Sequence, residues 1–278
     1  MDTLRSPVKS PLRGGFTLIE MSIVLVIIGL IIGAIMVGRD LMRAGELRAI
    51  GAESMRYRTA MNGFRDKYQG LPGDITNATS FWGTEAAGGG CPYNTVASTT
   101  TATCNGDGDW NISTYPYANN LYETYRAWQQ LANAGLIEGG YTGITASGNA
   151  LLPLSVIGSN VPASKYNGGG WSLFSLSIFG NWSTWFTANY GSFLVFGGYN
   201  AGAFGGVAPG LSSAPILKAE DAYNIDNKLD DGLPQSGMIL TFKYNAASRP
   251  DCVNSSNTGY NRQTTSQNAC FLMFLTGY

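Results

Sequence analysis

An uninterrupted apolar stretch near the N-terminus constrains this chain more than any other feature. Residues 21–38 contain no charged side chain. As a helix they would extend roughly 27 Å at about 1.5 Å per residue, close to the hydrocarbon thickness of a bilayer. One carboxylate, Glu20, stands at the head of this stretch. We therefore expect a membrane-spanning helix with an ionisable group at its start, which is a functional candidate by position.

The residues before this stretch indicate how the chain is processed. A secretory signal peptide is cut after its apolar run, at small residues. Here the small residues come before the run, and they are followed directly by Phe16. A cut between Gly15 and Phe16 would remove a short basic leader and keep the apolar helix. Glu20 would then lie four residues from the new N-terminal amine.

The hexapeptide Gly-Phe-Thr-Leu-Ile-Glu at residues 15–20, followed by the apolar run, resembles the class III signal of type IV prepilins and of type II secretion pseudopilins. The resemblance covers about residues 13–39. It implies that a prepilin peptidase cleaves after Gly15 and that Phe16 becomes N-methylated. It also implies that Glu20 pairs with the terminal amine of a neighbouring subunit, since opposite charges among apolar helices neutralise each other. An ordinary signal anchor is the alternative interpretation, but it needs none of these residues.

The helix is expected to continue well beyond the bilayer. Apolar residues recur at roughly helical spacing after residue 40, and Gly70-Leu71-Pro72-Gly73 supplies a stop and a turn. A helix over residues 16–69 would be about 80 Å long, a length that suits a filament subunit. We therefore divide the chain into a leader (1–15), a transmembrane and polymerisation helix (16–70) and an extracytoplasmic domain (71–278).

The pattern of the remaining residues predicts an α+β domain. A second helix is expected from Asn120 to Gly135, with Glu123 in a capping box and an apolar stripe facing the core. A short helix is expected within residues 215–230. Four aromatic and aliphatic stretches read as strands of an antiparallel sheet, namely residues 171–179, 193–196, 238–244 and 271–275. A long helix packed on such a sheet agrees with the pilin architecture.

Composition argues against several classes of function. The chain has 17 basic and 18 acidic residues, and removal of the leader leaves 14 against 17, a formal charge of −3. This balance gives no electrostatic footprint for nucleic acid. The absence of histidine removes the usual serine-hydrolase triad and histidine-ligated zinc. With no nucleotide-binding or nucleophile motif in the sequence, we expect that the protein is not an enzyme.

Four cysteines lie beyond the span, which favours disulfides in an oxidising compartment. Three pairings are open, and the local one, Cys91–Cys104 with Cys252–Cys270, is the simplest. A four-cysteine metal site is the competing idea, but it needs close Cys-x-x-Cys pairs that this chain lacks.

Two acidic segments are candidate cation sites. Asn105, Asp107 and Asp109 alternate with glycines, as in the first half of a calcium loop. Trp110 stands where a glycine is usual and the twelfth position holds no glutamate, so an Asx-rich turn is the competing interpretation. The second segment contains Asp226, Asp230 and Asp231, which we interpret as a solvated turn at a helix end.

A glycine-rich loop at residues 197–210, with Trp182, Trp185 and Tyr190 before it, is either an adhesive surface or ordinary sheet packing.

Together these features predict a structural subunit, minor or specialised, of a type IV pilus or related filament. A type II secretion pseudopilin shares the same N-terminal features and is the first alternative. A membrane-tethered binding module that does not polymerise is the second. The resemblance implies other pilin subunits, the prepilin peptidase, an inner-membrane assembly platform and membrane lipid as partners. It also implies an inner-membrane precursor with a periplasmic domain that later joins a pilus or a periplasmic filament.

Overall fold

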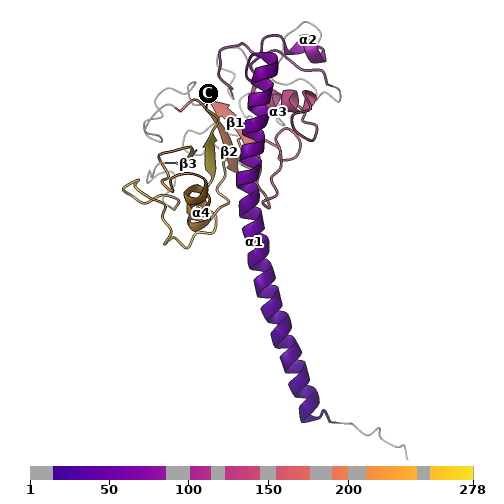
Figure 1. Ribbon diagram of the computed structural model, residues 1–278, viewed down its shortest axis with the longest axis vertical. Coiled ribbons are helices and arrows are strands. Elements are labelled where there is room, and N and C mark those ends of the chain that lie inside the picture. Colours follow the sequence, from indigo (N-terminus) through magenta and orange to yellow (C-terminus); the bar gives the residue numbers. More distant parts are fainter. Residues whose placement is uncertain are drawn as a thin grey trace, which may run out of the picture. The chain divides into compact units, whose positions relative to one another are not determined.

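One long helix, α1 (Leu18–Tyr68), is the first element that the structure describes (Figure 1). The structure is a computed structural model, and it describes residues 15–85, 101–113, 123–144, 155–175, 190–199, 211–242 and 251–277. The chain forms two compact units, Met1–Gly45 and Glu46–Tyr278, and α1 contributes to both. With 51 residues, α1 extends about 77 Å.

In the first unit, the large apolar side chains of α1 are exposed. Leu18 is 92% exposed, Leu25 70% and Leu30 69%. The helix contains an eighteen-residue window of mean hydropathy 2.8, so its length and composition are sufficient to cross a membrane. An apolar surface of this extent needs a covering that water does not provide.

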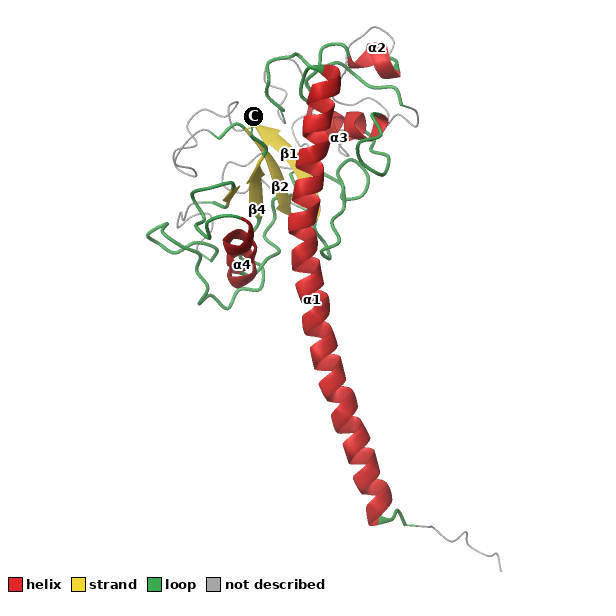
Figure 2. Cartoon of the chain, in the orientation of Figure 1, coloured by secondary structure: helices red, strands yellow, loops and turns green. Residues whose placement is uncertain are grey.

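The second unit contains one antiparallel sheet, whose strands follow α3 (Glu123–Asn133) in the sequence (Figure 2). In spatial order the strands are β1 (Gly170–Ser175), β2 (Ser192–Gly197), β4 (Leu272–Leu275) and β3 (Ile239–Leu240). Trp171 faces Phe196 across the β1–β2 pair, and Leu194 faces Phe274 across the β2–β4 pair. The expected α+β organisation, a long helix followed by an antiparallel sheet, is therefore confirmed.

Both faces of the sheet are buried, because successive side chains of a strand alternate between faces. In β2, Leu194 and Phe196 join the core that includes α1 and α3. Phe193 and Val195 join a second core on the opposite face. The centre of β2 and the whole of β4 therefore read as continuous apolar runs rather than as alternating patterns.

Three aromatic side chains join α1 to the rest of its unit. The ring of Tyr57 on α1 lies 5.0 Å from that of Trp128 on α3 and 5.6 Å from that of Trp171 on β1, both edge to face. All three side chains are at most 1% exposed. Such pairs contribute about 0.5–1.5 kcal/mol each beyond their buried area.

A buried carboxylate on the same helix adds directional bonds. Glu53 is 6% exposed and accepts hydrogen bonds from Ser164 Oγ at 2.6 Å, Lys165 N at 2.9 Å and Trp171 Nε1 at 2.8 Å. Ser164 and Lys165 belong to the segment that leads into β1. Because a rotation of α1 would leave the buried indole N–H of Trp171 and two partly buried donors without their acceptor, Glu53 fixes the rotational setting of the helix on the sheet.

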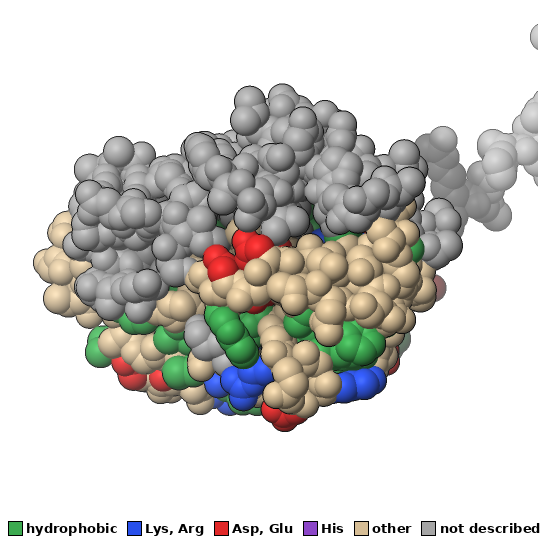
Figure 3. Space-filling model, turned by 90° about the horizontal axis from the view of Figure 1, so that it is seen from above, with side chains coloured by type: hydrophobic (Ala, Val, Ile, Leu, Met, Phe, Trp, Pro, Cys, Tyr) green, Lys and Arg blue, Asp and Glu red, His purple; other side chains and the backbone are tan. Residues whose placement is uncertain are grey.

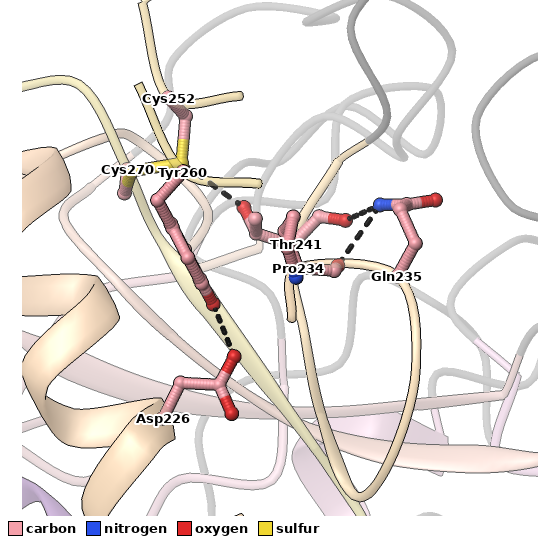
Figure 4. The surroundings of a disulfide bond; sticks show 7 residues. All are labelled: Asp226, Pro234, Gln235, Thr241, Cys252, Tyr260 and Cys270. Carbon is pink, nitrogen blue, oxygen red and sulfur yellow. Dashed lines mark hydrogen bonds between the residues drawn. A yellow bond between two sulfur atoms is a disulfide. The ribbon is translucent and has the colours of Figure 1, made fainter. Parts of the chain in front are cut away.

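A loop of the C-terminal region contacts helix α4 (Ala219–Leu229) (Figure 4). Cys252 and Cys270 form a disulfide that closes this loop. Within the loop, Tyr260 donates a hydrogen bond from its hydroxyl to Asp226 Oδ2 at 2.7 Å. Asp226 lies on α4 and is fully buried, so this hydrogen bond links the loop to the helix.

The sequence-based boundaries differ from the structure at several points. α1 starts and ends within two residues of the expected 16–69, and α4 falls inside the expected 215–230. Glu123 is the first residue of α3 that the structure describes, so its expected place in a capping box stays a prediction. Asn120 and parts of two expected strands (176–179 and 243–244) lie outside the described residues. The short helix α2 (Ala78–Trp82) was not expected.

We predict that Glu53→Ala destabilises the second unit by about 2 kcal/mol, because the buried indole N–H of Trp171 loses its acceptor, which costs about 1–3 kcal/mol, and two partly buried donors lose theirs. Guanidinium unfolding of the full chain in detergent micelles, followed by tryptophan fluorescence, measures the change. Asp66→Ala, an exposed substitution on the same helix, is the control and should stay within about 0.5 kcal/mol of wild type. Equal unfolding midpoints for the two variants would contradict the role given to Glu53.

Candidate functional site

The start of α1 is closed by a reciprocal pair of side chains, Thr17 and Glu20. Thr17 donates to Glu20 Oε2 from its backbone N and from its Oγ1, both at 2.7 Å. Glu20 N donates in return to Thr17 Oγ1 at 3.3 Å. This is a capping box, which satisfies two of the backbone donors that a helix start leaves free.

The capping box adds Thr17 to the N-terminal site predicted from Gly15, Phe16 and Glu20. The sequence contains the signal for it, a threonine followed three residues later by glutamate before an apolar run. Phe16 directly precedes this pair and is 81% exposed. In a single subunit, the Glu20 carboxylate thus has donors of its own at the positive end of the helix. Pairing with a neighbour's amine would have to compete with Thr17.

A second candidate site is a group of four carboxylates in the second unit. Asp74, Asp107, Asp109 and Glu123 each place an oxygen within 4.8 Å of the others. Asp107 and Asp109 are exposed, whereas Asp74 and Glu123 are 2% and 1% exposed. The structure therefore joins two residues of the predicted calcium segment with two that come from distant parts of the chain.

Asp74 lies at the centre of the loop that follows Cys104. Its Oδ1 accepts from Gly108 N at 2.7 Å and Asp109 N at 3.1 Å, and its Oδ2 accepts from Trp110 N at 3.0 Å. Consecutive backbone donors of this kind form a concave site for an anion, here filled by the protein's own carboxylate. The close fit requires glycine at position 106, where a Cβ would lie 2.3 Å from the backbone of Asp74.

Glu123, on α3, approaches the same loop. Its carboxylate accepts from Ser113 N at 2.9 Å and from Asp107 N at 3.3 Å. The turn that carries Asp74 packs directly on α3 at this residue, because a Cβ at Gly73 would lie 2.4 Å from the carbonyl oxygen of Glu123. Gly73 also has a positive φ of 89°, which favours glycine. The loop, the turn and α3 thus bring the carboxylates together.

Burial and the neighbouring charges make the two buried carboxylates, Asp74 and Glu123, hard to ionise. Burial, with help from the charges of Asp109 and Asp107, raises the pKa of Asp74 to about 6. Burial raises the pKa of Glu123 to about 8, and the charges of Asp74 and Asp107 add to the effect. Near neutral pH the group must therefore either hold protons or be compensated by a cation.

The arrangement is chemically suited to a divalent cation, since calcium prefers carboxylate and carbonyl oxygens. Asp74 and Glu123 are ligand candidates that the sequence did not indicate. The third predicted residue, Asn105, has another partner, because its Oδ1 accepts a hydrogen bond from Thr79 N of α2 at 2.8 Å. Calcium at Asn105, Asp107 and Asp109 stays a prediction.

The second acidic segment forms a smaller group. Asp226, Asp230 and Asp231 place oxygens within 4.8 Å of one another. Asp226 accepts from Tyr260 and from Gly232 N, and burial raises the pKa of its carboxyl to about 7. Each of the other two accepts hydrogen bonds from the turn that follows α4. Asp230 and Asp231 lie in the expected turn at a helix end, but the interpretation of Asp226 as solvated is wrong, because it lies on α4 and is buried.

The remaining predicted residues are only partly described. Cys104 is disulfide-bonded, while Cys91 lies outside the described residues, so the predicted pair Cys91–Cys104 stays a prediction. Trp182, Trp185 and most of the glycine-rich loop also lie outside them. Tyr190 packs its ring 6.1 Å from that of Phe193.

We predict that acidification stabilises the second unit. A carboxyl whose pKa is higher in the folded state holds its proton more tightly there, so stability is greatest below about pH 4.5 and falls as the pH rises towards 8. Glu123→Gln should reduce this loss and raise the melting temperature at pH 8 in chelator, by about 2–4 °C per kcal/mol of relieved repulsion. Thermal unfolding of the full chain in detergent at pH 5 and pH 8 measures it.

Glu138→Gln, an exposed substitution of the same kind, is the control for this prediction and should leave the pH dependence unchanged. A wild-type pH slope in Glu123→Gln would contradict the prediction. Millimolar calcium separates the two ways of compensating the charge. If calcium binds, it should raise the melting temperature of wild type at pH 8 more than that of Glu123→Gln or Asp107→Ala.

Comparison with known proteins bears on the N-terminal site. Residues 11–36 match a family described as the prokaryotic N-terminal methylation motif. No curated protein and no solved structure matches the chain. The matched residues include the proposed cleavage position, the Thr17–Glu20 capping box and much of the apolar stretch. Residues 11–36 thus carry the N-terminal methylation motif, the class III signal of type IV pilins, and together with the long apolar helix this motif supports a pilin-like precursor.

Proposed function

We propose that this chain is a structural subunit of a type IV pilus or a related filament. In this proposal a prepilin peptidase removes residues 1–15 and methylates Phe16, and the mature subunit leaves the inner membrane to join other pilin subunits. The observation that carries the proposal is one helix with two different surroundings. Its first part exposes almost every large apolar side chain, and its last part is packed into a folded domain.

The exposed apolar surface of α1 suits a molecule that changes its environment. In the bilayer, lipid covers these side chains. In a filament, the corresponding helices of neighbouring subunits would cover them, and Glu20 would be the charged group among them. A permanent anchor needs the apolar stretch alone, so the methylation motif and Glu20 favour assembly over simple tethering.

The alternatives differ in the fate of the mature protein. A pseudopilin of a type II secretion system would share the processing and the helix, and its deletion would abolish secretion rather than motility, DNA uptake or attachment. A tethered binding module would remain in the membrane. Mass spectrometry of sheared surface filaments tests the proposal directly, since it reports incorporation, cleavage and methylation together.

The first prediction concerns processing. Gly15→Val should block removal of the leader, because a branched side chain replaces a small, flexible residue beside the cut. The wild-type protein in filaments should begin at Phe16 and carry one N-methyl group, as an intact mass would show. Gly14→Ala is the control and should be processed. A mass that corresponds to residues 1–278 in assembled material would refute the proposal.

The second prediction separates the two interactions available to Glu20. Glu20→Ala should leave insertion and cleavage intact but lower incorporation into filaments, because a neighbour's terminal amine loses its partner. Glu20→Gln is the matched variant, since glutamine can still close a capping box but carries no charge. If charge pairing drives assembly, both variants fail. Normal incorporation of Glu20→Gln would show that only the helix cap matters, and normal incorporation of Glu20→Ala would rule out both roles.

A further inference from the structure

Three asparagines of this chain, Asn62, Asn105 and Asn167, are followed directly by glycine. An Asn-Gly pair is prone to lose its side-chain amide, because glycine has no side chain to hinder attack by its own backbone nitrogen on the asparagine Cγ. By sequence alone the three pairs are equivalent. The structure distinguishes them, because each pair has a different backbone environment.

Two of the pairs are held by hydrogen bonds. Gly63 lies inside α1, where the helix engages its backbone N–H. Gly106 N donates to Ile75 O at 2.9 Å, and Asn105 Oδ1 accepts from Thr79 N at 2.8 Å. Attack by either glycine nitrogen would therefore require the fold to open locally first.

The third pair forms the apex of an exposed turn. Gly169 N donates to Tyr166 O at 2.9 Å, which closes a turn of four residues. Gly168 has a positive φ of 75° and Asn167 does not, as in a type II turn. Both central residues are exposed. Among the residues that the structure describes, no hydrogen bond engages the Asn167 side chain or Gly168 N. Both reacting groups are therefore accessible in the folded chain.

This turn also supports the contact between α1 and the sheet. Ser164 Oγ donates to Glu53 at 2.6 Å and Lys165 N donates to it at 2.9 Å. Ser164 N donates to Gly169 O at 2.9 Å, so these two donors belong to the same hairpin as the turn. The far end of the turn is tightly packed, because a Cβ at Gly169 would lie 2.8 Å from Phe196 Cε2. A change at the apex is therefore passed on to the donors of Glu53.

We propose that Asn167 is a site of spontaneous deamidation and that this modification weakens the hold of the turn on Glu53. Gly168 N loses its proton and bonds to Asn167 Cγ, the bond from Cγ to the amide nitrogen breaks, and ammonia leaves. Water then opens the resulting succinimide at either carbonyl, which gives aspartate or isoaspartate. Water is the only co-reactant. The inference concerns the second unit and does not depend on the filament role.

The two products change the turn in different ways. Both add a carboxylate to the hairpin that binds Glu53, and like charges repel. Charged residues make up only 13% of the chain, and Figure 3 shows that on one face the described charges form small separate groups. Isoaspartate also leads the main chain through the Cβ of residue 167, which adds a methylene group to the turn. The longer apex would displace Ser164 and Lys165 from Glu53.

Incubation of the purified full-length chain in detergent at mildly alkaline pH tests the site. Peptide mapping by mass spectrometry should find about tenfold more deamidation at Asn167 than at Asn62 or Asn105, because only the latter two need local opening. Isoaspartate at this position should accept a methyl group from a protein isoaspartyl methyltransferase. In guanidinium, where the fold is absent, the three pairs should react at similar rates. Equal rates in the folded chain, or an Asn167 that stays intact, would overturn the proposal.

A second measurement tests the link to Glu53. Guanidinium unfolding should give a lower midpoint for incubated wild type than for fresh protein. Asn167→Gln is the matched control, since glutamine keeps the amide but closes a ring much more slowly, and its midpoint should not change on incubation. In Glu53→Ala the decrease should be smaller than in wild type, because the acceptor of the turn is already gone. Equal decreases in wild type and Glu53→Ala would retain the modification site and refute its link to Glu53.

Discussion

The fold of the second unit depends on how α1 is fixed against the sheet, and Glu53 is central to that contact. A carboxylate on a helix is ordinarily solvated, and its burial is costly unless donors replace the lost water. Here a hydroxyl, a backbone N–H and an indole N–H do so, all from the segment that leads into and forms the start of β1. Tyr57 lies one turn further along the helix, between Trp128 and Trp171. Apolar packing supplies most of the attraction, while the carboxylate selects one rotation of the helix.

That rotation determines which side chains α1 leaves exposed. The face with Ile50, Tyr57, Met61 and Phe64 enters the core, so the opposite face, including Arg48 and Met55, must point outward. The helix thus has three kinds of surface. Its first segment is apolar and exposed, and its last segment has one face buried in the core of the domain and an opposite face that is exposed. A single continuous helix links them, so the position of the domain along the helix also sets where the outward face lies.

Much of this fold was predictable because its signals are local. The chargeless run, the Gly-Leu-Pro-Gly stop and the aromatic strands each follow from neighbouring residues, and α1, β1, β2 and β4 lie close to their expected positions. α2 was missed because five residues are too few to show helical periodicity, and its start is satisfied by Asn105 from a distant loop. Glu53 was missed for a similar reason, since a lone glutamate on an amphipathic helix resembles any solvated residue.

The acidic group shows most clearly where sequence reasoning stops. Asp107 and Asp109 were recognisable by their spacing, but Asp74 and Glu123 join them only because the turn at Gly73 packs on α3 beside Glu123. The loop's backbone donors already stabilise one carboxylate, which explains how Asp74 is tolerated inside. These donors do not neutralise the charge of all four carboxylates. The excess negative charge is divided between two buried carboxylates, Asp74 and Glu123, and two exposed ones, Asp107 and Asp109. A proton or a cation that compensates this charge must therefore also affect the tertiary contact between this loop and α3.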